Sequence, residues 1–222
     1  MNDYTNLIIE GIQIGDQIGG PTELAKILTD SLIVNKRFDE QDLRQRYLNW
    51  WKSDAFDTGP TYANVFNKID KEMDPKLAVK KVHEEFGFKT AGCGPAHRAT
   101  PLAGMLAIPT NQLITLAKQE AKITHFDDDA GNGSAIVIML CRYLLEGKSF
   151  EDAENLISNS KDLKESWTKL QNAKLKPDGY VYNVIFSALH FIKKNKTLED
   201  TFQFAGKANY CPIIFSVIKR CI

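Results

Sequence analysis

Apolar residues recur at a spacing of three or four along almost the whole chain, which limits the folds open to it. Leu24, Ile27 and Leu28 follow this spacing early in the chain, and Ile185 and Leu189 follow it late. The spacing places apolar side chains on one face of an α-helix, whereas a half-buried strand would alternate every second residue. No stretch sustains that alternation. The sequence therefore predicts an all-α protein, with helices over residues 3–17, 22–35, 39–52, 60–72, 76–86, 101–107, 110–121, 129–146, 150–158, 161–172, 179–194, 198–206 and 209–220.

The composition bounds the size of the domain and its partners. Of the 222 residues, 43% are apolar, and no stretch rich in Gly or Pro resembles a linker. We therefore expect a single domain over residues 1–222. The 28 basic and 28 acidic residues give a formal net charge of zero. The positive field that attracts nucleic acid or anionic lipid is missing, so neither partner is expected.

The chain carries no pattern typical of export or membrane insertion. Its first residues, MNDYTNLIIEG, lack the basic and then apolar order of a secretory signal, and the longest apolar run, 135–141, is too short to span a bilayer. The four cysteines form no CxxC pair. This argues against a zinc site and a disulfide scaffold. We expect a soluble, cytoplasmic protein with free thiols.

Three glycines, Gly11, Gly15 and Gly19, stand four residues apart near the N-terminus. On a helix they would form a stripe without side chains, which lets another helix approach closely. Each glycine lowers helix stability by roughly 1 kcal/mol relative to alanine. Close packing or a binding site is therefore expected to compensate.

The stretch DAFDTGPT, residues 54–61, allows two interpretations. Asp57-Thr58-Gly59 matches the tripeptide of aspartic proteases, but those enzymes need two such turns in a β-rich body to hold two carboxylates together. Only one copy is present, in a helical context. We therefore favour a helix start, with Pro60 in the first turn and Asp57 or Thr58 as the cap.

Four further stretches carry a resemblance to a known family. They are GIQIGDQIGGPTE from Gly11, AGCGPAHRATPLAGML from Ala91, THFDDDAGNGSAIVIM from Thr124, and the segment from Gly179 that ends in AGKANYC. In this order and spacing they resemble the ADP-ribosylglycohydrolase family, which includes the dinitrogenase reductase activating glycohydrolase and the ADP-ribosylarginine hydrolases. The resemblance implies an all-α, orthogonal helical bundle that cleaves the N- or O-glycosidic bond between ADP-ribose and an acceptor.

The resemblance also implies a binuclear Mg²⁺ or Mn²⁺ centre at helix ends. The early ligand segment of the family aligns with residues 56–59, so Asp57 and Thr58 are candidate metal ligands, with Asp54 and Asp127 as further candidates. Hard divalent cations prefer several oxygen ligands, largely carboxylates. For the three residues from Asp127 to Asp129, the alternative is that they complement the dipole of the following helix.

The late ligand segment departs from the family pattern. Lys207 and Asn209 stand where the family has two aspartates, and Tyr210 replaces a threonine. An ammonium group in place of a carboxylate repels a cation. We therefore expect one Mg²⁺ or Mn²⁺ ion at most, in a divergent and C-terminally short member of the family.

The resemblance assigns roles to further residues. It implies catalytic roles for Glu23 and Asp57, and we expect the helix starts after Asp57 and Thr124 and the segment at Lys207 to meet in one pocket. For Arg98 a structural ion pair is the alternative to ligand binding. The residues expected to bind substrate are Asp16, Gly92, Gly94, Arg98, His125 and Lys207.

Two functions remain open from the sequence. The first is a hydrolase acting on ADP-ribose or ADP-ribosylated protein with a partly degraded metal site. The second is a catalytically inactive protein that keeps the fold and serves as an ADP-ribose-binding or structural protein.

Overall fold

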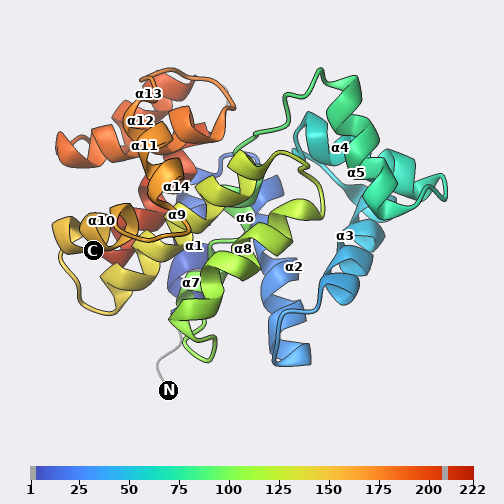
Figure 1. Cartoon of the computed structure of the whole chain (residues 1–222), viewed down its shortest axis with the longest axis horizontal. Helices are drawn as coiled ribbons and strands as arrows, with labels where there is room; N and C mark the ends of the chain where they lie inside the picture. The colour runs from blue at the N-terminus through green and yellow to red at the C-terminus, as the bar shows by residue number, and fades with distance from the viewer. Residues whose placement is uncertain (1–3, 207–209) are drawn as a thin grey trace.

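The computed structural model describes residues 4–206 and 210–222. Within these residues it contains α-helices, one short 3-10 helix and no strand (Figure 1). The predicted all-α class is therefore confirmed. The helices are α1 (Thr5–Gly15), α2 (Gly20–Asn35), α3 (Glu40–Asp54), α4 (Pro60–Asp70), α5 (Pro75–Glu85), α6 (Gly94–Arg98), α7 (Pro101–Gly104), η1 (Thr110–Gln112), α8 (Leu113–Lys122), α9 (Asp128–Leu145), α10 (Phe150–Ser158), α11 (Lys164–Gln171), α12 (Val181–Lys193), α13 (Leu198–Ala205) and α14 (Tyr210–Cys221).

Helix α9 lies at the centre of the bundle. From Ala130 to Arg142 its residues are buried, with the exception of Asn132. It packs against α6, α7, α8, α10, α12 and α14. A helix that is apolar on all sides is stable only when other elements surround it, which explains the central position of this sequence. Among the described helices, none offers an apolar stretch of the length that a lipid bilayer requires.

The one charged residue in the buried part of this helix, Arg142, is satisfied by hydrogen bonds from its guanidinium. It donates hydrogen bonds to the carbonyl oxygens of Ala103, Met105 and Ile108 at 2.8–3.0 Å. Ala103 lies in α7 and the other two residues follow it, and the end of a helix leaves its last carbonyl oxygens without partners. Arg142 thereby fixes the connection between α7 and η1 to the central helix.

The glycine stripe brings α1 and α14 together. A Cβ atom on Gly11 would lie 2.9 Å from the Cα of Val217, and one on Gly15 would lie 2.5 Å from the Cα of Ile213. The predicted close approach of another helix is therefore confirmed for these two glycines. Gly19 serves differently, because it lies beyond the end of α1 and caps α2 with a φ of +111°.

Local signals set several helix starts. The carboxylate of Asp74 accepts a hydrogen bond from the amide of Leu77, and Pro75 follows it in the first turn of α5. The predicted cap of α4 is wrong, since Gly59 occupies the N-cap position rather than Asp57 or Thr58. The junction needs a φ of +74°, which glycine adopts without a steric penalty.

Candidate ligand pocket

The starts of several helices meet around one pocket. The cavity measures about 550 Å³ and is lined by Pro21, residues 57–62, much of 86–97, and by His125, Asp127, Asp129, Gly179, Tyr180 and Tyr210. Residues 57–62 lead into α4, residues 125–129 lead into α9, and Tyr210 is the first residue of α14. In Figure 1, α3 to α5 and α10 to α13 lie on opposite sides of the central helices.

The structure brings six of the predicted site residues to this pocket and places three elsewhere. The lining includes Asp57, Thr58, Gly92, Gly94, His125 and Asp127, but not Asp16, Glu23 or Arg98. Lys207 lies outside the described residues, as does the side chain of Asp54 at the end of α3.

The loop with Asp57 forms one wall. Asp57 is exposed and has a φ of +48°, a conformation that aspartate adopts more readily than most residues. A Cβ on Gly20 would lie 2.4 Å from the carbonyl oxygen of Asp57. The first turn of α2 therefore packs directly against this loop and fixes its position.

Asp16 organises the turn before that helix. Its carboxylate accepts hydrogen bonds from the amides of Gly19 at 2.8 Å and Thr22 at 2.9 Å, and from the Thr22 hydroxyl at 2.7 Å. These amides belong to the free donors at a helix start. Glu23, in the same helix, forms a partly exposed ion pair with Lys26 at 2.7 Å.

The glycine-rich segment pairs with the start of α12. The amide of Cys93 donates to the carbonyl of Gly179, and the amide of Val181 donates to the carbonyl of Ala91, both at 3.0 Å. A Cβ on Gly92 would lie 3.1 Å from Nε2 of His125. The missing side chain at Gly92 thus leaves room for the imidazole at the pocket wall.

Arg98 lies behind this wall, in a buried ion pair. Its Nε donates to Oε1 of Glu120 at 2.6 Å, and both residues are at most 1% exposed. The guanidinium also lies over the rings of Tyr47 and Tyr62, 5.6 and 5.8 Å from their centroids. A buried cation requires such partners, which explains why Arg98 faces the core and not the cavity.

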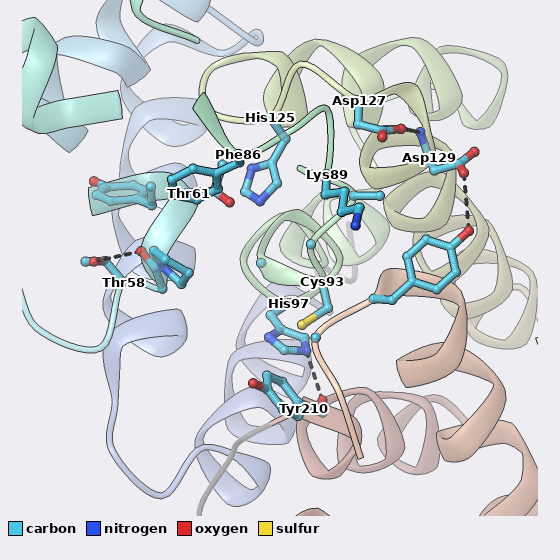
Figure 2. Close-up of a pocket in the computed structure, with 18 of the residues that line it drawn as sticks. Thr58, Thr61, Phe86, Lys89, Cys93, His97, His125, Asp127, Asp129 and Tyr210 are labelled. Atoms are coloured by element: carbon cyan, nitrogen blue, oxygen red, sulfur yellow. Dashed lines mark hydrogen bonds between the residues drawn. The ribbon is translucent and has the colours of Figure 1, made fainter. Parts of the chain in front are cut away.

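Two buried histidines, His97 and His125, line the pocket. Only His125 was predicted from the sequence as a site residue. Nε2 of His97 lies 2.9 Å from the carbonyl oxygen of Tyr210, to which it donates (Figure 2). Burial lowers the pKa of His97 to about 4. Burial, together with the nearby Arg98 cation, lowers the pKa of His125 well below its usual value. Both imidazoles are therefore neutral near pH 7.

The two acidic residues at the start of α9 that line the pocket already have partners. Asp127 caps the helix by accepting a hydrogen bond from the amide of Asp129 at 3.0 Å. Asp129 pairs with Lys169 at 2.8 Å and accepts from the hydroxyls of Tyr180 and Tyr182. The partners of Asp129 could not be predicted from the sequence, because they lie 40 to 53 residues away in the chain.

The described residues do not form a site that fits Mg²⁺ or Mn²⁺. Among them, no three His, Cys, Asp or Glu side chains come together in a group that could hold a metal ion. Figure 2 shows Thr58 on one side of the pocket and Asp127 and Asp129 on another. A hard cation needs several oxygens within one coordination sphere, and oxygen ligands on separate walls do not supply them.

The buried His97 predicts that acid destabilises the protein. The folded state takes up a proton on His97 only near pH 4, whereas the unfolded chain does so near pH 6.5. Stability is therefore lost as the pH falls from 6.5 towards 4, by about 2 kcal/mol at pH 5. Urea unfolding at pH 7 and pH 5 measures this loss. His97→Gln keeps a donor for the Tyr210 carbonyl and should reduce this loss. A loss in His97→Gln as large as that of the wild type would contradict the prediction.

Comparisons with known proteins agree with the fold. A family model described as ADP-ribosylglycohydrolase matches residues 5–208. A solved structure described as "ADP-ribosylglycohydrolase-related protein complex" matches with a TM-score of 0.73 and 19% sequence identity, over 99% of this chain and 87% of that chain. At this identity the structural match shows the fold alone, but the family match spans most of the sequence. The chain therefore belongs to the ADP-ribosylglycohydrolase family.

Proposed function

We propose that this protein binds an ADP-ribosyl group in the pocket and that binding does not depend on a divalent ion. The observation that carries the proposal is the convergence of four distant segments, with Asp57, Gly92, His125 and Tyr210, on one cavity of about 550 Å³. Pockets for small ligands commonly measure about 300–1,000 Å³. The cavity thus suits a nucleotide-sized ligand.

The lining offers groups for each part of such a ligand. The rings of Phe86 and Tyr210 provide surfaces on which a nucleobase can stack. The carboxylate of Asp127 can accept hydrogen bonds from ribose hydroxyls. Lys89 reaches into the space between these walls (Figure 2), and no ion pair is found for it among the described residues. Its ammonium group is a suitable partner for a diphosphate.

Hydrolysis is the second candidate function, and the position of Asp57 and Thr58 on the pocket wall favours it. In that reaction, water would add across the glycosidic bond, placing a hydroxyl on the ribose and a proton on the acceptor. Asp57 would orient the reacting water, and Glu23 would take part only after its ion pair with Lys26 is broken. We rank this candidate second because the described carboxylates do not gather around one point.

Titration calorimetry tests the binding proposal. ADP-ribose should bind with similar affinity in EDTA and in Mn²⁺. Lys89→Met should weaken ADP-ribose by about tenfold, or ~1.4 kcal/mol, because a charged hydrogen bond to the diphosphate is lost. Adenosine, which lacks the diphosphate, should bind both proteins equally. Lys161→Met, an exposed lysine outside the pocket lining, is the matched control. Binding that requires Mn²⁺ would refute the proposal.

A turnover assay separates the two functions. ADP-ribosylated arginine and serine peptides are incubated with the wild type and with Asp57→Asn, with and without Mn²⁺. Turnover that disappears in Asp57→Asn would establish the hydrolase. Absence of turnover in a protein that binds ADP-ribose would establish the binding function.

A further inference from the structure

A continuous chain of hydrogen bonds runs through the core from α3 to the pocket. The hydroxyl of Tyr47 donates to Oε1 of Glu120 at 3.0 Å, and Nε of Arg98 donates to the same oxygen at 2.6 Å. Nη2 of Arg98 donates to Oγ1 of Thr124 at 2.8 Å. Thr124 Oγ1 in turn lies 2.7 Å from Nδ1 of His125. All five residues are at most 4% exposed.

The directions of these hydrogen bonds determine which nitrogen of the His125 imidazole carries the proton. Arginine has only donors, so the Thr124 oxygen must accept from Arg98. The hydroxyl proton of Thr124 then needs an acceptor of its own, and Nδ1 of His125 is the one that the described residues place within reach. Nδ1 therefore carries no proton. A neutral imidazole has one N–H group, which must then be Nε2–H.

Nε2 lies on the pocket side of the ring. A Cβ on Gly92, which lines the pocket, would lie only 3.1 Å from this nitrogen. Within the described residues, the imidazole of His125 has no hydrogen bond other than the one at Nδ1. Figure 2 shows the imidazole of His125 pointing into the pocket. The Nε2–H group is thus available to a ligand.

We infer that Arg98 and Thr124 are positioning residues that hold His125 as its Nε2–H tautomer, so that the pocket presents a hydrogen-bond donor at this point. The complementary ligand atom is an acceptor, such as a phosphate or carbonyl oxygen. The inference rests on the proposed function only for the identity of that ligand, because the tautomer is a property of the free protein.

Nitrogen-15 NMR of the free protein tests the tautomer. The chain has four histidines, and His125→Gln identifies the signals of His125 by their loss. In the wild type near neutral pH, the Nε2 signal should lie at the upfield position of a protonated nitrogen and the Nδ1 signal at the downfield position of a bare one. The reverse pattern, or two protonated nitrogens, would overturn the inference even if ADP-ribose binds.

Variants at Thr124 test the positioning role. In Thr124→Val the Nδ1 signal should move, and ADP-ribose affinity should fall about fivefold, the usual effect of one lost hydrogen bond. Thr124→Ser should restore the wild-type signals. Thr29→Val, which removes a buried hydroxyl bonded to the Ala25 carbonyl in α2, should leave the His125 signals unchanged.

These measurements distinguish the two proposals. Unchanged nitrogen signals in Thr124→Val would overturn the role of Thr124. The expected tautomer in a protein that does not bind ADP-ribose would refute the proposed function and leave the inference intact.

Discussion

Arg98→Met should destabilise the protein by about 3–5 kcal/mol, because it leaves the carboxylate of Glu120 buried without its cation. Glu120 is fully buried, and besides Arg98 its only hydrogen-bond donor among the described residues is the hydroxyl of Tyr47. Urea unfolding followed by circular dichroism at pH 7 measures the loss. This prediction has the largest expected effect on stability.

Two further variants show whether the loss comes from the unpaired charge. The double variant Arg98→Met with Glu120→Leu removes both charges and should recover part of the stability, since apolar replacements of buried ion pairs are often neutral. Lys26→Met breaks the partly exposed pair with Glu23 and should change stability by less than about 1 kcal/mol. An Arg98→Met loss as small as that of Lys26→Met would contradict the buried pair.

Gly15→Ala should destabilise the protein by about 3 kcal/mol, although alanine favours helices more than glycine does. The new methyl group would lie 2.5 Å from the backbone of Ile213, so α1 and α14 would have to separate. In a protein of this size the melting temperature should fall by roughly 6–12 °C, measured by calorimetry.

The control for this prediction is Gly94→Ala in α6. A Cβ there meets only ordinary contacts, the nearest being Nη1 of Arg98 at 3.5 Å. It should change the free energy of unfolding by less than about 0.5 kcal/mol. Equal melting temperatures for the two variants would show that α1 and α14 do not pack as closely as described.

Helices could be predicted from the sequence wherever the helical spacing of apolar residues continues over several turns. The stripe of apolar side chains in α2 or α12 arises within one helix, so the sequence alone indicates it. Helix α6 was missed because residues 94–98 are too few for one period of that pattern to repeat. The cap of α4 was misplaced for a related reason. Asp57 itself has a positive φ, and its backbone packs against Gly20, a contact that no local pattern records.

The order of the motifs predicted the pocket, since segments with Asp57, Gly92 and His125 do line one cavity. The partners of each side chain could not be predicted. Arg98 meets Glu120 and lies over Tyr47, 22 and 51 residues away in the sequence.

The sequence by itself determined the helical class, the close approach of another helix to the glycines of α1, and several of the segments that line the pocket. These follow from periodicity, from the absence of side chains, and from motif order. Only the tertiary structure decided which charges are used inside the core and which face the ligand. A carboxylate beside Arg98 turns that residue inward, and Lys169 engages Asp129. Pairing of buried charges depends on distances between helices that are far apart in the chain, and the sequence does not encode these distances locally.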